Sequence, residues 1–281
     1  FTESKFKDAV DVIREYVLAG DAMQVVVSQR LSVPFNAEPI NFYRALRSLN
    51  PSPYMFYMRD HHGVLLGCSP ELHLSVKATD AQEREVAITP IAGTKPRGFR
   101  QGSICPELDQ RYAIALQTDE KELAEHVMLI DLARNDIASI AKIGTTIVTN
   151  SFAIKKYSHV QHLVSRVAGH LKEEVDALTA YLATMNMGTL TGAPKVKAMQ
   201  LIAGLEENDH GYFGGGIGFV THDGNMETAI VIRSMRVKNE KVYLRAGAGI
   251  VADSVPENEW LETEAKMQAC VRALNEAVKH D

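Results

Sequence analysis

The order of the predicted strands constrains the fold most, because they follow one another in pairs rather than alternating with helices. The runs "YMFYMR" (54–59) and "GVLLGCSPELHLSV" (63–76) flank "DHHG" and predict a hairpin. Further strands are predicted at 23–33, near 86–92, and at 216–221, 227–237 and 241–246. Short connections join antiparallel strands, whereas parallel strands need long crossovers. The sequence therefore predicts an α+β fold of antiparallel β-sheets covered by helices.

Helices are predicted where apolar residues recur every three or four positions. Such spacing is found in 3–19, where Gly20 ends the helix, and in 107–141, 173–184, 194–204 and Pro256 to about Val278. Residues 98–110 are polar and predict a loop. Since neither a repeat nor a clear linker interrupts the chain, we expect a single domain over residues 1–281.

Composition excludes several classes of protein. The 281 residues are 46% hydrophobic with a net charge of −5, which favours neither nucleic acid nor anionic membranes as partners. Apolar runs are too short for a membrane span, and three scattered cysteines indicate a reducing, cytoplasmic setting. Because the chain begins at Phe1 rather than methionine, we expect a fragment or a processed chain.

Two predicted helices each carry a pair of glutamates at one end of an apolar stripe. Positions 122, 125, 129, 132 and 136 share one helix face and hold Glu, Glu, Leu, Leu and Asp. Positions 259, 262, 266, 270 and 274 hold Glu, Glu, Lys, Cys and Leu, with Leu274 and Val278 expected in the core. Two inward-facing pairs around a common centre would bind a hard cation, and all-oxygen ligands favour Mg²⁺. For either pair alone, a solvated helix face is the common alternative.

Glycine-rich segments supply candidate anion sites. In "PIAGTKPRG" (90–98), Gly93 would let the backbone approach a ligand, although a plain turn explains the same residues. In "GTLTGAPK", Pro194 is expected at the first helical position, with Thr191 or Gly192 as the cap. This helix N-terminus would face an anion with help from Lys195, or would simply be capped. The string "GGGIG" opens no helix in a βαβ unit, which excludes a dinucleotide fingerprint.

His162 and Arg233 are the remaining candidates. His162 lies in the apolar stretch "YSHVQHLVSRV", so we expect a partly buried imidazole that acts as an acid or base, or a core histidine. Arg233 ends the predicted strand "ETAIVIRSMRV", where it could bind a carboxylate through two hydrogen bonds or form a surface ion pair.

Seven segments in one order resemble the chorismate-utilising enzymes. They are "PIAGTKPRG", "ELAEHVMLIDLARND", "HLVSRV", "GTLTGAPK", "ETAIVIRS", "AGAGIVADS" and "ENEWLETEAK", and the resemblance runs from about residue 3 to the C-terminus. Within the family, the aminase subunits of anthranilate synthases are the most similar. The resemblance implies that the antiparallel sheets pack as a sandwich.

The resemblance also implies roles for individual residues. Glu125 and Glu262 match magnesium ligands, with Glu122 and Glu259 beside them. The positions that match chorismate-binding residues are Gly93, Thr94, Phe213, Arg233, Gly247, Ala248 and Gly249. Thr189 and Lys266 match polar groups of the active site. His162 matches the histidine that helps to release pyruvate, and Glu71 matches the acid that protonates the departing hydroxyl. Pro53, Tyr54 and Met55 match part of a feedback tryptophan site.

The nucleophile implied by the resemblance is ammonia. Relatives that add water carry a lysine where this chain has Gln24, and relatives that form a covalent lysine adduct carry it at the position of Ala92. The implied reaction converts chorismate and ammonia to anthranilate and pyruvate in tryptophan biosynthesis. None of the cysteines has the setting of a glutaminase nucleophile, so a separate glutamine amidotransferase subunit is expected to supply the ammonia.

Three alternatives to this function stay open. The chain could be an aminodeoxyisochorismate synthase that stops after amination, an aminodeoxychorismate synthase, or a non-catalytic relative that binds tryptophan or a partner. One position departs from the family, since Phe213 stands where a tyrosine hydroxyl usually contacts the substrate. If Tyr212 and Phe213 lie in a strand, Tyr212 points to the opposite face and cannot replace that hydroxyl.

Overall fold

The computed structural model describes residues 1–79, 83–157 and 159–277. Within them the chain forms two compact units, each built from separate stretches of sequence. The first comprises Phe1–Pro70, Asn186–Ile217 and Ile230–Asp281, and the second comprises Glu71–Met185 and Gly218–Ala229. The single domain expected from the sequence stays a prediction.

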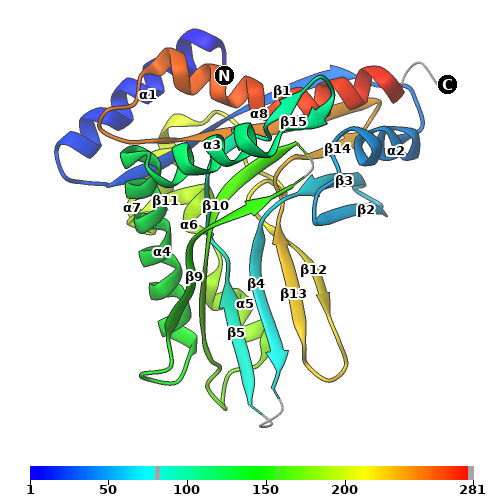
Figure 1. The fold of residues 1–281 in the computed structure, drawn as a ribbon. Coiled ribbons are helices and arrows are strands. Elements are labelled where there is room, and N and C mark those ends of the chain that lie inside the picture. Colours follow the sequence, from blue (N-terminus) through cyan, green and yellow to red (C-terminus); the bar gives the residue numbers. More distant parts are fainter. Residues whose placement is uncertain (80–82, 158, 278–281) are drawn as a thin grey trace. The chain divides into compact units, whose positions relative to one another are not determined.

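The first unit contains a six-stranded antiparallel sheet in the order β11-β1-β15-β14-β3-β2 (Figure 1). Its strands are β1 (Gln24–Pro34), β2 (Tyr54–Asp60), β3 (Gly63–Ser69), β11 (Gly192–Ala193), β14 (Ser234–Lys238) and β15 (Lys241–Ile250). Its helices are α1 (Glu3–Leu18), α2 (Pro39–Leu49), α6 (Gly188–Thr191), α7 (Lys195–Leu205) and α8 (Pro256–Ala277). The hairpin predicted around "DHHG" is confirmed as β2 and β3.

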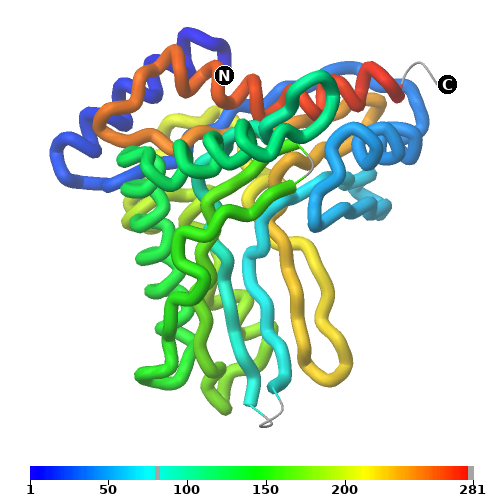
Figure 2. The backbone as a smooth tube through the Cα atoms, in the orientation of Figure 1, coloured from blue at the N-terminus to red at the C-terminus, as the bar shows by residue number. Residues whose placement is uncertain are grey.

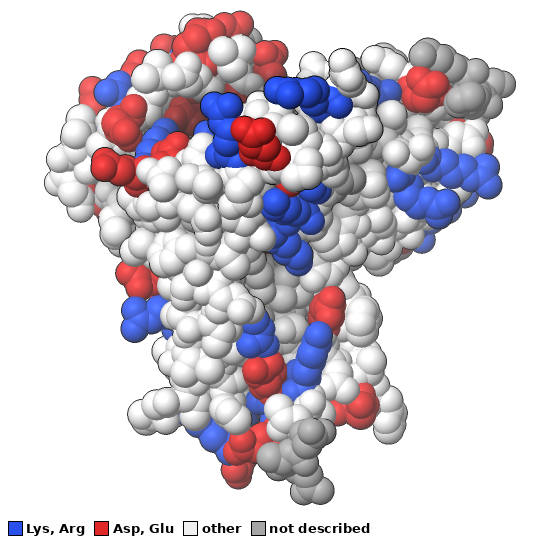
Figure 3. All heavy atoms as spheres, viewed as in Figure 1, with Lys and Arg blue, Asp and Glu red and all other residues white. Residues whose placement is uncertain are grey.

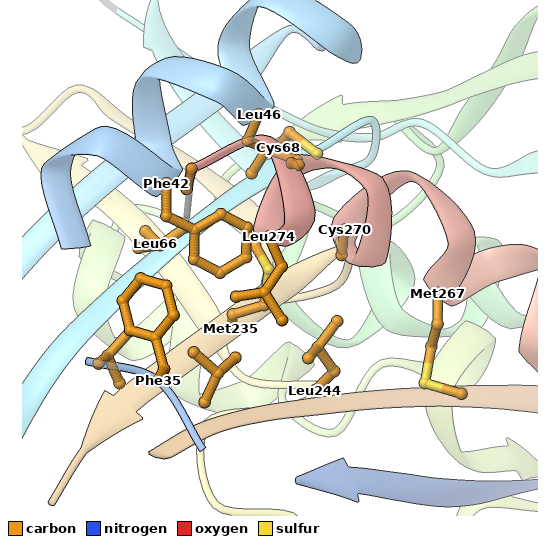
Figure 4. Packing of buried hydrophobic residues seen from close by; sticks show 14 of the residues in the cluster. Phe35, Phe42, Leu46, Leu66, Cys68, Met235, Leu244, Met267, Cys270 and Leu274 are labelled. Atoms are coloured by element: carbon orange, nitrogen blue, oxygen red, sulfur yellow. The ribbon is translucent and has the colours of Figure 1, made fainter. Parts of the chain in front are cut away.

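Two apolar clusters hold the helices of this unit to its sheet. In one, Phe42 of α2 and Leu274 of α8 contact Leu66 and Leu244 of the sheet, as the close-up shows (Figure 4). In the other, α1 and α7 pack on β1 and β15, with Phe6 completely buried. Leu274 is buried as predicted, whereas Val278 lies outside the described residues.

The second unit contains most of a seven-stranded sheet in the order β12-β13-β4-β5-β10-β6, with β9 paired to β10. Its strands are β4 (Leu72–Ala78), β5 (Arg84–Ile88), β6 (Ile91–Pro96), β9 (Ile147–Lys156), β10 (Val160–His170), β12 (Gly216–Val220) and β13 (Met226–Ile230). A small hairpin joins β7 (Phe99–Arg100) to β8 (Ser103–Ile104), and the helices are α3 (Pro106–Gln117), α4 (Glu120–Ile140) and α5 (Ala177–Thr184). The tube in Figure 2 follows β9 and β10 side by side, next to α4. The predicted antiparallel α+β class is confirmed.

Helix α4 buries a face that is offset from the predicted one. Its completely or nearly buried side chains are His126, Ile130, Ala133, Ile137 and Ile140. Leu129 and Leu132, on which the predicted stripe relied, are half-buried. The buried line follows the same steps of three and four, but it runs from Glu122 through His126 and is shifted by one residue from Glu125, Leu129 and Leu132. Glu122 therefore stands at the head of the buried face, as predicted, whereas Glu125 stands beside it.

Three further local predictions were wrong. The run 227–237 forms two strands in different sheets, β13 and β14, separated by a break at Val231–Arg233. Residues 98–110 contain the β7–β8 hairpin and the start of α3 rather than a plain loop. Pro194 is the N-cap of α7, with φ −65° and ψ 141°, so the helix begins one residue later than expected.

The described part of the chain contains no helix with both the length and the apolar character needed to cross a membrane. On the face drawn in Figure 3, acidic and basic side chains are interspersed.

Candidate functional site

His162 lies at a β-bulge in the second unit. Gln161 of β10 pairs with Lys95 of β6, whereas Leu163 pairs with Ala92, so one residue of β10 stands opposite two of β6. The two are Gly93 and Thr94, and Gly93 has φ +61°, a conformation that glycine adopts without strain. Bulges re-aim side chains and end regular pairing. The glycine of "PIAGT" therefore serves a bulge within a strand, not the plain turn that was the alternative.

The bulge determines which nitrogen of His162 carries the proton. Its Nδ1 lies 2.9 Å from the carbonyl oxygen of Gly93 and 3.1 Å from Oγ1 of Thr94. Because a carbonyl can only accept, Nδ1 is the donor, and in the neutral ring the basic lone pair belongs to Nε2. The ring also meets Tyr157 edge-on, with centroids 5.6 Å apart. His162 is half-buried, as predicted, with a defined tautomer.

Gly93 also allows a close approach to α4. A Cβ on this residue would lie 2.8 Å from Oε2 of Glu122 and 2.5 Å from Cδ1 of Leu116. The carboxylate of Glu122 therefore lies against the strand that carries Gly93 and Thr94. The structure brings together four of the predicted site residues of this unit: Gly93, Thr94, His162 and Glu122.

Glu125 lies one turn further along α4. Its side chain is 30% exposed, and its Oε1 lies 3.9 Å from Nζ of Lys121, a separation that is too long for a hydrogen bond. Asp119 caps the helix by accepting from the backbone N–H of Glu122. The cap fixes the first turn of α4 and, with it, the direction of both glutamates.

The sequence analysis missed His126, which is completely buried on α4. Its Nε2 lies 2.7 Å from Oγ of Ser165, and that oxygen also accepts from the backbone N–H of Phe152 at 3.0 Å. Burial lowers the pKa of His126 to about 4, so the imidazole is neutral at pH 7. Its spacing with Ile130, Ala133 and Ile137 could have placed it on the buried face.

In the first unit, the glycines of β15 turn backbone groups to the side of the strand that faces away from β1. Beyond Leu244, β15 pairs with β1 and, among the described residues, no longer with β14. Gly247 stands opposite Ser28, whose N–H turns away to Glu206, while the Gly247 oxygen accepts from Lys266. The Ser28–Gly247 pair is therefore of the non-hydrogen-bonded kind, and the N–H of Gly247 points away from β1. The same alternation turns the N–H of Gly249 to that side, as anion binding requires.

Ala248, by contrast, faces the core. Its side chain is completely buried in the cluster of α1, α7, β1 and β15, so only its backbone could contact a ligand. Gln24 lies on the face of the glycines, because its Nε2 is 2.2 Å from where a Cβ of Gly249 would stand. Gln24 and Ala92 are each 8% exposed. Both of the positions at which some relatives carry a lysine are therefore buried in this chain.

Lys266 connects the glycine strand to the acidic pair of α8. Its Nζ donates to the Gly247 oxygen at 2.8 Å and to Oε1 of Glu262 at 2.6 Å. The Glu262 side chain is 49% exposed, whereas Glu259, one turn earlier, is buried with 5% exposure. The structure therefore brings Gly247, Lys266 and Glu262 together.

Arg233 occupies the break between β13 and β14 with φ +49°. This left-handed conformation is uncommon for a residue with a side chain and costs about 1–2 kcal/mol. Its carbonyl oxygen accepts from the backbone N–H of Cys68 at 3.1 Å, which holds the strained backbone to β3. Arg233 therefore does not end a regular strand, as predicted, but sits at a kink of the kind that collects at functional sites.

Phe213 lies in a turn, and Thr189 lies in the short helix α6. Residues 211–214 form a turn rather than a strand, so the alternation argument about Tyr212 was wrong. The Tyr212 ring lies under the Arg236 guanidinium at 5.4 Å, and the Phe213 ring meets that of His210. None of the described residues gives the buried Oγ1 of Thr189 a hydrogen-bond partner, which suits a group that waits for a ligand.

Glu71 and the predicted tryptophan positions occupy strand ends. Glu71 is 9% exposed and stands directly before β4. Pro53 is exposed, while Tyr54 and Met55 are half-buried at the start of β2, an edge strand of its sheet. Their roles stay predictions.

The carboxylates present suit magnesium in type and number. Mg²⁺ keeps several waters and takes one or two protein carboxylates together with a substrate anion. Within the described residues, no group of three His, Cys, Asp or Glu side chains could hold a metal alone. Glu125 belongs to the second unit and Glu262 to the first, so their shared coordination stays a prediction.

The fold and these motifs place the chain in a known class: it belongs to the family of chorismate binding enzymes, whose pattern matches residues 1–272. Anthranilate synthase component 1 of Vibrio cholerae is 49% identical over 274 residues, covering 97% of this chain and 52% of that protein. The Escherichia coli protein of the same name is 48% identical with the same coverage. The crystal structure of anthranilate synthase component I from Streptococcus pneumoniae matches with a TM-score of 0.86 and 39% identity, covering 96% of this chain and 58% of that one.

These comparisons confirm the family and the fold. The chain spans about half the length of the curated relatives it matches. The sandwich packing of the two sheets stays a prediction.

Proposed function

We propose that this chain is the catalytic region of an anthranilate synthase component 1, converting chorismate and ammonia to anthranilate, pyruvate and water. The observation that carries the proposal is 49% identity over 97% of the chain to a protein of that name. The ordered bulge at His162 and the glycine edge of β15 support it, since both are built from the motifs of the resemblance. A cytoplasmic, tryptophan-biosynthetic role follows from the same proposal.

The choice of ammonia as nucleophile rests on two buried positions. Gln24 and Ala92 stand where the resemblance places lysines in relatives that use water or a covalent amine. An amide or a methyl group can neither deprotonate water nor attack the ring. An external amine is then the remaining nucleophile.

Substrate binding is assigned to backbone and cationic groups. The N–H groups of Gly247 and Gly249 and the side chain of Arg233 bind the carboxylate of the enolpyruvyl group. Thr189 offers its hydroxyl to the same ligand. With Phe213 in place of a tyrosine, one neutral hydrogen bond is lost, which weakens binding by about 0.5–1.5 kcal/mol.

Two groups move protons in the proposed mechanism. Glu71 donates a proton to the ring hydroxyl, which leaves as water while ammonia adds to the ring. The aminated ring then loses a proton, and the enolpyruvyl group departs with a proton as pyruvate, which makes the ring aromatic. His162 assists this second step through Nε2, while Nδ1 stays bonded to Gly93.

Magnesium is the proposed cofactor, with Glu125 and Glu262 as its protein ligands and Glu122 and Glu259 beside them. When bound, it would supply Lewis-acid polarisation of the ring carboxylate.

A separate glutamine amidotransferase subunit is the proposed source of ammonia. Burial raises the pKa of the Cys270 thiol to about 12 and raises that of Cys68 as well. Both thiols are protonated at pH 7, whereas a glutaminase nucleophile must be a thiolate. L-Tryptophan is proposed as an inhibitor that contacts Pro53, Tyr54 and Met55.

Incubation with chorismate, ammonium and Mg²⁺, followed by mass analysis, tests the reaction. Anthranilate is expected; the aminated intermediate alone would favour the aminodeoxyisochorismate synthase alternative, and no turnover would favour a non-catalytic relative. Glu125→Gln is expected to lose at least about 100-fold in kcat at limiting Mg²⁺, because one ligand of the Lewis acid is gone. Glu120→Gln, an exposed neighbour on α4, is the matched control and should behave as wild type.

A further inference from the structure

A buried ion cluster surrounds Asp109, on the first turns of α3 in the second unit. The Asp109 side chain is 4% exposed and accepts from Nε of Arg97 at 2.7 Å, Nη2 of Arg97 at 3.2 Å and Nζ of Lys156 at 2.8 Å. The backbone N–H of Gly98 donates to it at 3.0 Å. These charge-assisted hydrogen bonds, led by those of Arg97, hold the pKa of Asp109 well below its usual range.

The cluster joins three segments that are far apart in sequence. Arg97 and Gly98 follow directly after β6, and Lys156 ends β9. Arg97 also binds residues between β9 and β10. Its backbone N–H donates to the His159 oxygen, and its guanidinium donates to the Tyr157 oxygen. Gly98 cannot carry a side chain, because a Cβ would lie 2.1 Å from the backbone nitrogen of Asp109.

The same network reaches the β-bulge through Gln161. This buried side chain donates from Nε2 to the Pro96 oxygen at 3.1 Å and to the Asp109 oxygen at 3.2 Å. Gln161 is the residue before His162, and Pro96 lies two residues after Thr94. One end of the bulge is therefore fixed to α3, through both the side chain and the backbone of Asp109.

The anchor matters because the register of a strand decides which face each of its side chains occupies. If β6 slipped by one residue, every later side chain of the strand would change face. The hydrogen bonds of His162 to Gly93 and Thr94 exist only in the bulged register.

We propose that Asp109 is a positioning residue for catalysis: it holds the bulged register of β6 against β10 and thereby the orientation and tautomer of His162. The inference rests on the proposed function for its catalytic consequence, but its structural part does not. Asp109 contacts neither substrate nor His162, and acts through Arg97, Gly98 and Gln161.

Asp109→Asn tests the proposal, since it keeps the shape of the side chain and removes its charge. The ¹⁵N signals of His162, identified by their loss in His162→Gln, are expected to show the Nδ1–H tautomer in the wild type and a mixture in Asp109→Asn. In turnover with ammonium, Asp109→Asn is expected to raise the ratio of aminated intermediate to anthranilate by about 10- to 100-fold, as misplacement of an acid–base group predicts.

Two variants separate positioning from stability. Leu74→Ala creates a cavity in the core of the same unit and should leave both the tautomer and the product ratio unchanged. Arg97→Lys keeps the positive charge but removes the bidentate contact with Asp109, so it should change the tautomer and the product ratio in the same way. It replaces Asp109→Asn as the test if the Asp109→Asn protein does not fold. An unchanged His162 spectrum in a folded Asp109→Asn or Arg97→Lys protein would overturn the inference. If the wild-type protein produced no anthranilate, the proposed function would be overturned. The ¹⁵N spectra would still test whether Asp109 holds the tautomer of His162.

Discussion

In each compact unit, a buried carboxylate holds an irregular backbone segment, and the two clusters differ in how the negative charge of that carboxylate is compensated. In the second unit, Asp109 is compensated by Arg97 and Lys156, whose side chains are 13% and 37% exposed. In the first unit, Glu206 forms a salt bridge with Arg245 in which both side chains are at most 6% exposed, and the carboxylate also bonds to His210, which is 29% exposed. Loss of a cation that is partly exposed to water costs little unfolding free energy, whereas loss of one partner of a fully buried ion pair costs much more.

The Glu206 cluster anchors the segment that precedes the Phe213 turn. Its carboxylate also accepts from His210 at 2.9 Å and from both the N–H and the hydroxyl of Ser28. Burial opposes ionisation of Glu206, but the hydrogen bond from His210 and the charges of His210 and Arg245 together keep its pKa below the usual value. In both units, ion clusters therefore specify the backbone where regular pairing does not.

The largest effect is expected from Arg245→Met. This change leaves the buried Glu206 carboxylate without its main cation, which costs about 3–5 kcal/mol of unfolding free energy. Urea denaturation at pH 7 measures the loss. The control is Arg30→Met, an exposed neighbour bonded to Asn208, for which less than about 1 kcal/mol is expected. Equal losses of unfolding free energy in the two variants would contradict the proposed difference between the buried and the exposed arginine.

Gly93→Ala is expected to cost about 2–4 kcal/mol, because the positive φ strains alanine and the new methyl group displaces Leu116 and Glu122. Gly214→Ala in the other unit is the matched variant. It also has a positive φ, but its Cβ would lie 3.5 Å from the nearest atom, so about 1–2 kcal/mol is expected. Thermal unfolding of both variants should rank them in this order; the reverse would show that the bulge accepts a side chain.

Asp109→Asn is expected to cost about 1.5–3 kcal/mol at pH 7, the usual value for hydrogen bonds to a charged group. The folded-state pKa of Asp109 lies below its unfolded value, near 3.9. Its stabilisation is therefore complete above about pH 4–5 and disappears as the pH falls towards the folded-state pKa. Denaturation at pH 7 and pH 3 should show a smaller difference between wild type and variant at pH 3. A constant difference would mean that the lost interaction is not ionic.

The smallest effect is expected from Lys156→Met, which removes the more exposed cation of Asp109 and should cost at most about 1 kcal/mol. Its loss should shrink in 1 M salt, because water and ions reach this side chain. A loss comparable to that of Arg245→Met would remove the distinction between the two clusters.

The sequence predicted the class of the sheets and the motif residues, but not the buried residues that hold the motif residues in position. Hairpin spacing identified antiparallel pairing, and the resemblance identified His162, Gly93 and Thr94. Asp109 was missed because it lies in the segment that was predicted to be a loop. Its partners are also separate from it in the sequence, since Arg97 follows β6 and Lys156 ends β9. His126 was missed because the helical stripe was traced through the half-buried Leu129 rather than the buried Ile130.

Local pattern was misleading where tertiary contacts override propensity. The β-branched run before Arg233 predicts one continuous strand, yet the chain turns there to join a second sheet. Periodicity cannot show such a break, because the residues on both sides favour strands equally. A positive φ at an arginine is visible only in the structure.

The chain passes between the two compact units after Pro70, Met185, Ile217 and Ala229. Neither unit can therefore be expressed as one uninterrupted gene segment. A cut after Met185 or Ile217 divides both units, whereas a cut after Pro70 or Ala229 divides only the first. We expect a fragment covering 71–185 to lack the strands β12 and β13 that complete its sheet. Random truncation libraries should consequently yield few soluble clones, whereas co-expressed complementary halves could restore both sheets at once.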